Sequence, residues 1–459
     1  MRTGELGFWW RSLGGAPAPR DPLPDSTEAD VAIVGAGYTG LWTAYYLKRA
    51  QPSLHVVVLE AERAGYGASG RNGGWATGFF SGPPRRYERN GGRAGFLGLQ
   101  REMFETVEEI ARVLAREGIE ADYAKGGQLT VALDDAQARR RREHVRQLRE
   151  LGVSADDLHE LGAEELAARV SVAGARTATF SPHAARLHPA KLVVGLTAAA
   201  ERLGVKIYEQ TPVREIVAGE ARTALGNVRA RWIVRATEGY TASLRGQRRV
   251  LVPVNSSIVV TRPLSAEVWE QIGWSGEELL EDNAHVFVYL QRTADGRIAI
   301  GGRGVPYRYG SRAGGAGATA QATVEQLRSK LAAMFPATAG VELDHAWSGV
   351  LGVARDWCVS VGADANTGAA WAGGYVGQGV AAANLAGRTL RDLLLGQPTA
   401  PTLAPWVAHP PARRWEPEPL RWCGIRGLYS LYRRADAIER RSGRPSALAG
   451  LVDRASGRH

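Results

Sequence analysis

One stretch, residues 28–75, constrains the fold of this chain more than any other. An apolar strand is expected over Asp30–Val34, a helix over Leu41–Ala50 and a second apolar strand over His55–Leu59. An acidic residue, Glu60, follows the second strand directly. Strand, helix and strand in this order predict a β-α-β unit within an α/β protein.

The turn between the first strand and the helix carries three glycines with the spacing G-x-G-x-x-G. Gly35 permits the tight turn, Gly37 lets a pyrophosphate approach the backbone, and Gly40 lets helix and strand pack closely. The helix N-terminus offers unpaired N–H groups and a partial positive charge to phosphates. Glu60 follows the last glycine by about twenty residues, where a carboxylate accepts hydrogen bonds from ribose hydroxyls and would repel a 2′-phosphate. These features predict a bound dinucleotide other than NADP.

The residues after Glu60 favour FAD over NAD. The run ERAGYGASGRNGGW is small and polar, and we expect it to form a loop. FAD continues past its pyrophosphate into a ribityl chain and an isoalloxazine ring, which the loop can follow with backbone N–H groups and with Ser69, Arg71 and Asn72. The stretch resembles the flavoprotein amine and amino-acid oxidases of the D-amino acid oxidase superfamily. Its GASGRNGG run is similar to the γ-glutamylputrescine oxidase-like and glycine oxidase-like branch.

The resemblance covers most of residues 1–400 and is strongest over 28–75 and 345–395. It implies an α/β fold (α+β overall), in which a Rossmann-like FAD-binding domain is interleaved with a sheet-rich substrate domain. The implied FAD-binding domain comprises residues 1–90, 186–245 and 345–400, the substrate domain residues 91–185 and 246–344, and a helical C-terminal tail residues 401–459.

A second glycine turn, GGYVGQG, follows an expected strand over Ala369–Ala372 and precedes a helix that begins near Val380. The N-terminus of that helix would offer N–H donors to the negative charge that a reduced flavin carries at its pyrimidine end. A turn that serves helix packing alone is the alternative. Two glycine-opened helices in one chain match the two ends of one FAD.

The candidate cofactor-binding residues come from the G-x-G-x-x-G motif, the loop after Glu60, the second glycine turn and the family resemblance. The resemblance alone implies a backbone contact of Val213 with adenine and a role for the strand end ATEGY, where Glu238 replaces the family's usual amide. Trp75 and Trp347 are expected to flank the flavin. The full set is Gly35, Ala36, Gly37, Tyr38, Thr39, Gly40, Glu60, Ala61, Ala68, Ser69, Arg71, Asn72, Gly73, Gly74, Trp75, Val213, Ala236, Thr237, Gly239, Trp347, Gly349, Gly374, Tyr375, Val376, Gly377, Gln378, Gly379 and Val380.

We expect the FAD to be non-covalent. Relatives that form a thioether use a cysteine ahead of the region corresponding to 352–356, and Cys358 lies beyond it. The histidyl linkage of other branches arises in the glycine loop, where this chain has Arg71 and Asn72.

Four residues are candidates for substrate contact. Tyr289 lies in a strand that corresponds to a face above the flavin, and a core tyrosine is its alternative. Arg303 could meet a substrate carboxylate with paired hydrogen bonds, or it could be a surface arginine. Arg355 stands where many relatives have proline, and Gln378 replaces a histidine often seen in the family's turn.

The resemblance implies hydride transfer from the carbon next to nitrogen to flavin N5, giving an imine, with reoxidation by O2 to H2O2. Such a hydride transfer depends more on the positioning of the substrate than on acid–base groups. Consistent with this, the sequence shows no nucleophile triad, no carboxylate pair and no metal-ligand spacing. A dehydrogenase or a biosynthetic tailoring enzyme with another electron acceptor is a close alternative. A basic RNA-associated flavoprotein is an alternative from another class.

Composition narrows these classes. The net charge of +10 invites a nucleic-acid interpretation. Most arginines, however, are scattered or lie on expected helix faces such as 136–152, so we interpret them as solvated and do not expect a nucleic-acid partner. Two cysteines and no membrane-length apolar run favour a cytoplasmic protein. We expect a monomer or homodimer. An apolar stripe (Trp422, Ile425, Tyr429, Tyr432) is expected to dock on the protein itself, or to form a dimer contact.

Overall fold

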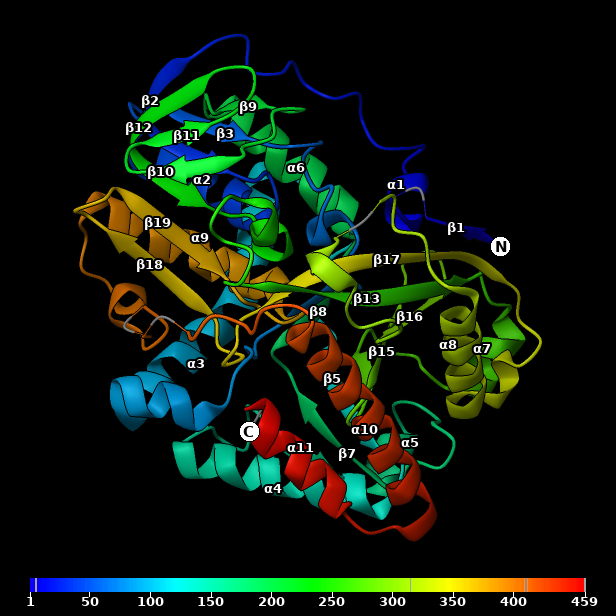
Figure 1. Ribbon diagram of the computed structural model, residues 1–459. Coiled ribbons are helices and arrows are strands. Elements are labelled where there is room, and N and C mark those ends of the chain that lie inside the picture. Colours follow the sequence, from blue (N-terminus) through cyan, green and yellow to red (C-terminus); the bar gives the residue numbers. More distant parts are fainter. Residues whose placement is uncertain (5, 314, 408, 411, 458–459) are drawn as a thin grey trace.

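The computed structural model describes residues 1–4, 6–313, 315–407, 409–410 and 412–457. Two large sheets organise the chain, and the expected mixed α/β class is confirmed (Figure 1). Within the described residues no helix is long and apolar enough to cross a membrane.

The first sheet contains the β-α-β unit. Its main path runs β10 (Glu215–Val217), β11 (Glu220–Arg222), β12 (Asn227–Arg235), β2 (Thr27–Val34), β3 (Val56–Leu59) and β9 (Lys206–Tyr208), and β12 also pairs with β19 (Ala369–Gly373), which pairs with β18 (Ser360–Asp364). The pairs β12–β2, β2–β3, β3–β9 and β12–β19 are parallel. Parallel strands with helices on their faces are buried on both sides, and the last four residues of β2 and all of β3 are buried.

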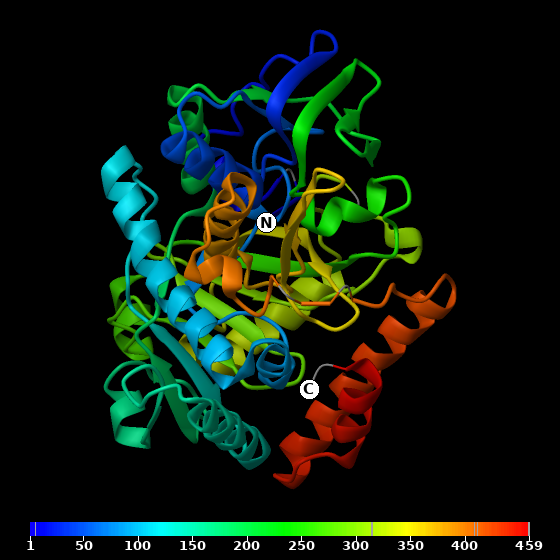
Figure 2. The same ribbon diagram turned by 90° about the vertical axis from the view of Figure 1, so that its left-hand side faces the viewer.

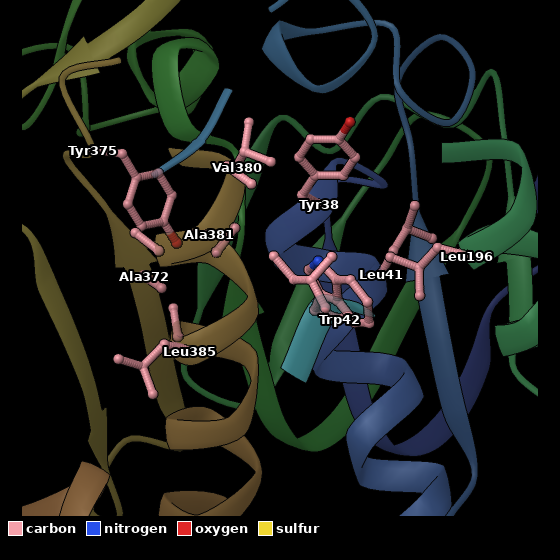
Figure 3. Close-up of a cluster of buried hydrophobic side chains, with 14 of the residues drawn as sticks. Tyr38, Leu41, Trp42, Leu196, Ala372, Tyr375, Val380, Ala381 and Leu385 are labelled. Atoms are coloured by element: carbon pink, nitrogen blue, oxygen red, sulfur yellow. The ribbon is translucent and has the colours of Figure 1, made fainter. Parts of the chain in front are cut away.

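Three helices cover this sheet: α2 (Tyr38–Ala50), α6 (Pro189–Arg202) and α9 (Gly379–Leu395). Figure 3 shows α2 and α9 side by side, with Tyr38 and Trp42 on one helix and Val380 and Ala381 on the other. The close approach depends on Gly387, because a Cβ atom there would lie 2.8 Å from the Trp42 Cβ atom. Both glycine-opened helices therefore belong to one packed unit.

The second sheet has nine strands. They are β1 (Arg2–Thr3), β17 (Leu343–Val353), β13 (Val252–Thr261), β16 (Ile298–Gly302), β15 (Val288–Arg292), β14 (Leu279–Asp282), β5 (Gln128–Ala132), β7 (Thr177–Ser181) and β6 (His159–Leu161), in that order across the sheet.

Alternation along these strands gives the second sheet two unlike faces. One face presents a row of aligned apolar residues that pack with α8 (Gln321–Met334), namely Leu280, Leu290, Ile300, Val259 and Ala346. The neighbouring row, on the opposite face, is Thr130, Glu281, Tyr289, Gly301, Ile258 and Trp347. We call this second set the inner row.

The remaining elements connect and cover the sheets. They are α1 (Phe8–Arg11), β4 (Trp75–Thr77), α3 (Pro84–Glu117), α4 (Asp135–Leu151), α5 (Ala163–Ala167), β8 (Ala184–Arg186), α7 (Ala266–Ile272), α10 (Leu420–Ser442) and α11 (Ala447–Ser456). In Figure 2 the long helix α3, in cyan, runs past both sheets along one side of the molecule. It is kinked at Gly92, whose φ is 67°.

Some boundaries differ from the sequence-based expectation. Helix α2 begins at Tyr38 rather than Leu41. The domain boundary expected at residue 345 falls inside β17, which adds to the nine-stranded sheet. The division into two domains stays a prediction.

The C-terminal segment docks on the body of the protein, as the stripe on α10 indicated. Ile425 is buried with Val252 and Tyr307, and Trp422 and Tyr429 pack against the same cluster. Tyr432 is buried with Val286 and Val452. Figure 1 shows α10 and α11, in red, beside α4.

A polar cluster fastens the same helix. His285, Asp436 and Glu439 lie close enough together to hold a metal ion, an arrangement that the sequence does not reveal because two distant segments form it. Asp436 accepts hydrogen bonds from the backbone N–H groups of residues 285 and 286, and Arg140 donates to Glu439 at 3.0 Å. These contacts indicate a docking role for the cluster.

Candidate functional site

The first glycine turn has the geometry that its spacing predicts. Gly35 has a φ of 108°, a conformation that residues other than glycine rarely adopt. A Cβ atom at Gly40 would lie 1.9 Å from the Gly35 carbonyl oxygen, so no side chain fits there. The first residues of α2 have no intrahelical acceptor for their N–H groups, and the Tyr38 N–H donates to the Ser69 Oγ atom at 2.8 Å. The turn and the following loop are thus held together at the N-terminus of α2, where a phosphate is expected.

Glu60 lies at the end of β3, beside this turn. Its carboxylate accepts hydrogen bonds from the Ala36 N–H at 2.7 Å and from the Glu62 N–H at 3.1 Å. Burial raises the pKa of Glu60 to about 7, and the Ala36 and Glu62 N–H groups oppose that shift. Ala61 follows Glu60 in the loop. This placement suits an acceptor for ribose hydroxyls.

The other nucleotide-end candidates surround the same turn. Ala236 and Thr237 follow β12, and the Ala236 carbonyl oxygen would lie 2.7 Å from a Cβ atom at Gly35. Gly239 is buried in the short helical turn Glu238–Ser243. Val213 is partly buried and packs on the small apolar cluster around β2 and β3. Strand ends therefore bring these residues to one edge of the first sheet.

The glycine loop leads from the first turn to a cavity. Ala68 and Ser69 form a 3₁₀ turn, and the Asn72 side chain stabilises the loop by donating to the Ser69 carbonyl and accepting from the Gly74 N–H. Gly73 approaches Tyr289 so closely that a Cβ atom would lie 2.6 Å from its ring. Trp75 begins β4, and its ring meets Tyr289 edge-to-face with 5.9 Å between centroids.

Arg71 is the buried cation of this loop, with 3% of its surface exposed. Its Nε donates to the Tyr66 carbonyl at 2.7 Å, and its guanidinium lies over the Tyr66 ring. Its Nη2 atom is buried without a hydrogen-bond partner in the described residues. A buried cationic donor of this kind is costly unless something accepts from it.

The second glycine turn is strained and tightly held. Val376, a β-branched residue, has a φ of 53°, which is an outlier for such a side chain. The Glu238 side chain holds this turn in place. Its carboxylate accepts hydrogen bonds from the backbone N–H groups of Gly374 at 3.1 Å, Tyr375 at 2.9 Å and Gly352. The Tyr375 hydroxyl lies 2.9 Å from Thr39 Oγ1, and this contact joins the second glycine turn to the N-terminal end of α2.

Glu238, which replaces the family's usual amide in ATEGY, thus holds the second glycine turn. Burial raises its pKa to about 7, and the hydrogen bonds from Tyr375, Gly352 and Gly374 oppose that shift. Because the folded pKa lies above the ordinary value of 4.5, its contribution to stability is complete below about pH 4.5 and is lost as the pH rises through about 7.

We therefore expect Glu238→Gln to flatten the pH dependence of stability by about 2–3 kcal/mol. The variant should also weaken FAD binding, because its amide NH2 faces a backbone N–H that the carboxylate accepted. Denaturant unfolding at about pH 5 and about pH 8 measures the first effect. Glu267→Gln on an exposed helix is the control, and equal pH slopes for wild type and Glu238→Gln would contradict the assignment.

A cavity of about 510 Å³ lies between the glycine loop, the second glycine turn and the second sheet. Twelve predicted site residues line it: Ala68, Arg71, Asn72, Gly73, Trp75, Tyr289, Arg303, Gly349, Val376, Gly377, Gln378 and Val380. Gly379 begins α9 directly behind the turn. The structure thus brings the flavin-end candidates and three of the four substrate candidates to one space.

The three substrate candidates face this cavity with different chemistry. The Tyr289 hydroxyl lies 3.0 Å from Ser256 Oγ, and burial raises the pKa of Tyr289, which keeps the phenol protonated. Arg303 donates to the Val376 carbonyl at 3.4 Å, and no described carboxylate lies within salt-bridge distance of it. Gln378 accepts from Ser81 Oγ at 3.2 Å and begins the turn into α9.

Two predicted site residues lie elsewhere. Arg355 pairs with Glu416 at 3.1 Å and donates to the Ser456 carbonyl, so it fastens the C-terminal segment rather than facing the cavity. Trp347 is fully buried behind the loop, where its indole N–H donates to the Arg71 carbonyl at 2.8 Å. It supports the glycine loop instead of lining the cavity wall.

The comparison with protein families decides the assignment. Residues 30–393 match the DAO family, described as FAD dependent oxidoreductase. The chain belongs to this family. A curated relative of the oxidoreductase is gamma-glutamylputrescine oxidoreductase of Escherichia coli (strain K12), which is 32% identical over 385 residues, 83% of this chain and 86% of the relative.

Solved structures agree on the fold of the oxidoreductase. Glycine oxidase from Geobacillus kaustophilus matches with a TM-score of 0.70 and 20% identity over 85% of this chain and 100% of that one. L-proline dehydrogenase from P. horikoshii matches with a TM-score of 0.67 and 19% identity over 84% of this chain and 98% of that one. The resemblance seen in the sequence is confirmed, and FAD is the cofactor of the oxidoreductase.

The residues of the oxidoreductase fit that cofactor. Arg71, whose buried Nη2 atom has no partner in the described residues, and Val380 in the first turn of α9 both line the cavity. Ser69 of the same glycine loop accepts from the Tyr38 N–H at the start of α2. Sequence reasoning missed several cavity residues, including Ser81, Gln128, Ser256, Glu281 and Phe287. Gln128, Ser256 and Glu281 lie in strands, whose alternation in the sequence does not reveal their partner strands, and Ser81 and Phe287 lie outside the strands, where the sequence carries no such signal.

Proposed function

We propose that the protein is an FAD-dependent oxidase of a primary or secondary amine or an amino acid. One observation carries the proposal: the glycine loop and the second glycine turn share one cavity with Tyr289 and Arg303. A flavin ring held by the glycine loop and the second glycine turn would therefore lie beside a substrate held by Tyr289 and Arg303. The names of the relatives, gamma-glutamylputrescine oxidoreductase and glycine oxidase, support C–N donors.

FAD, when bound, supplies the acceptor for a hydride from the carbon next to the substrate nitrogen. The chain's own residues position the substrate and exclude water. Trp75, Phe80 and Ile258 give the cavity apolar walls, which favour the neutral amine whose lone pair drives the oxidation. The Tyr289 hydroxyl, kept protonated, can donate one hydrogen bond to the substrate while Ser256 orients it.

Anaerobic mixing of the purified protein with a panel of amines and amino acids tests the proposal. We expect at least one member to bleach the visible absorbance of the flavin. If no member of a broad panel does so while dithionite bleaches it fully, amine oxidation is the wrong reaction class.

Arg303 gives a prediction about substrate class. Arg303→Met should lower kcat/KM for amino acids by about 10–100-fold, because a bidentate pair with the substrate carboxylate is lost. Amines without a carboxylate should keep their kcat/KM to within about threefold, since no guanidinium–carboxylate pair stabilises them. Arg308→Met, at an exposed position near the same segment, is the control. A uniform loss across both classes would mean that Arg303 holds the turn through Val376 rather than the substrate.

The electron acceptor is the second part of the proposal. We propose O2, with H2O2 as product, and the fold shared with L-proline dehydrogenase keeps a dehydrogenase as the alternative. Peroxide formed in step with substrate during aerobic turnover supports an oxidase. Rapid turnover with a quinone and little peroxide would support the dehydrogenase.

We also propose that FAD is non-covalent. Neither Cys358, which is buried beside Tyr87, nor Cys423 lines the cavity described above. Acid precipitation should release all of the flavin into the supernatant. A cytoplasmic location and a monomeric or homodimeric state stay predictions, and so does the absence of a nucleic-acid partner. On the basic helix α4, Arg146 pairs with Glu143 and Glu150 on the same surface.

A further inference from the structure

The far wall of the cavity carries a carboxylate that the mechanism above does not use. Glu281 belongs to the inner row and stands directly opposite Tyr289 on the neighbouring antiparallel strand. Directly opposed residues of an antiparallel pair have Cβ atoms about 5 Å apart on the same face. Glu281 therefore lies one strand beyond Tyr289, on the side away from Ile258.

The surroundings of Glu281 supply neutral donors to one of its oxygens. Gln128 Nε2 and Thr130 Oγ1 each donate to Oε1 at 3.0 Å. Thr77 Oγ1 donates to Gln128 Oε1 at 2.7 Å and so fixes the orientation of that amide. Three side chains from two strands thus fix the position of Oε1. The other oxygen, Oε2, has no hydrogen bond to the described residues.

The charge of Glu281 is uncompensated at close range. Within the part of the chain that the structure describes, no arginine, lysine or histidine reaches salt-bridge distance of Glu281. Arg141, the nearby cation on α4, donates instead to Thr179 Oγ1 at 2.7 Å. Asp282, the next residue, points to the other face, where it pairs with Lys330 at 3.5 Å. A carboxylate that is partly buried and has no paired cation is costly.

Burial accordingly raises the pKa of Glu281, and the charge of Arg141 and the hydrogen bond from Thr130 oppose the shift. A cation delivered by a ligand would offset the burial cost and hold the carboxylate ionised. The cavity is the space from which such a cation can come, because Glu281 lines it together with Arg303 and Gln378.

We propose that Glu281 binds a second, positively charged nitrogen of the substrate, so that the preferred substrates are diamines or N-substituted amines with a distal ammonium group. This inference rests on the proposed amine oxidation and names its substrate class. One nitrogen, neutral, lies at the flavin end of the cavity, and the other, protonated, lies against Glu281 beyond Tyr289.

The test compares straight-chain α,ω-diamines of three to six carbons with monoalkylamines of equal length. For the wild-type holoenzyme we expect kcat/KM for the best diamine to exceed that of its matched monoamine by at least about 10-fold, as a charge-assisted hydrogen bond allows. Glu281→Gln should remove that preference, leave the monoamine value within about threefold, and leave the flavin spectrum unchanged. Glu160→Gln, a carboxylate at the exposed edge of the same sheet, should behave as wild type.

Calorimetric binding of the same compounds to oxidised enzyme separates this inference from the reaction itself. Diamine binding that depends on Glu281, without bleaching of the flavin, would support the cation site and overturn amine oxidation. Bleaching by amines with no preference for a second nitrogen, or a preference that survives in Glu281→Gln, would overturn the cation site alone. A Glu281→Gln variant that loses monoamine and diamine turnover equally would also overturn it.

Discussion

Replacement of Gly40 by alanine is expected to abolish FAD binding. The added Cβ atom would lie 1.9 Å from the Gly35 carbonyl oxygen, far inside van der Waals contact. The turn cannot yield easily, because the Gly35 N–H donates to the Leu59 carbonyl at 2.8 Å and the first turn of α2 is buried. We expect a loss of about 3 kcal/mol or more in the free energy of unfolding and a colourless protein after purification.

Gly98→Ala is the matched control for this variant. Gly98 lies in helix α3, is exposed, and a Cβ atom there would meet nothing within 4 Å. Alanine at an exposed helical position should stabilise the protein by about 0.5–1 kcal/mol and leave FAD bound. Visible absorbance and thermal unfolding measure both variants. A Gly40→Ala protein with a normal flavin content would show that this turn does not hold the cofactor.

Replacement of Arg71 by methionine is expected to weaken FAD binding by about 100-fold, as the loss of a charged donor in a buried site implies. The guanidinium is buried at the cavity wall, and its Nη2 atom has no partner in the described residues. Methionine also leaves the Tyr66 carbonyl, which accepts from Nε at 2.7 Å, without its donor.

Titration of the apoprotein with FAD measures this effect. Arg71→Lys keeps the positive charge but loses the planar guanidinium with its several N–H donors. The affinity of this variant for FAD should therefore fall between those of wild type and Arg71→Met. Arg231→Met, at an exposed position on β12, removes an arginine from the same sheet region and should change nothing. Wild-type affinity in Arg71→Met would assign the residue to loop structure alone.

The sequence predicts the part of the fold that binds the nucleotide well, because the residues that indicate it lie close together in the chain. Glycines 35, 37 and 40 act through their own φ angles and close approaches, and the flanking strands are continuous apolar runs. Helix α3 shows the limit of local signals. Its first turns contain Gly91, Gly92 and Gly95, which disfavour helix, yet the chain stays helical up to a kink at Gly92.

The substrate end of the site depends on pairing between distant strands. The sequence predicts Trp347 beside the flavin, but β17 joins the second sheet and places the Trp347 side chain behind the glycine loop. Arg355 follows β17 and is drawn away by Glu416 of the C-terminal segment. The sequence does not indicate Glu281 as a cavity residue, because β14 is a four-residue strand and its position beside Tyr289 follows only from the strand register.

The central claim is that one elongated cofactor is held at both ends, by the turn before α2 and by the turn before α9. The affinity of the apoprotein for FAD, compared with its affinity for ADP and for FMN, tests this directly. Because two linked contacts bind far more tightly than either alone, we expect FAD to bind at least about 1,000-fold more tightly than each half. FMN binding as tightly as FAD, or failure of the apoprotein to take up FAD, would contradict the account.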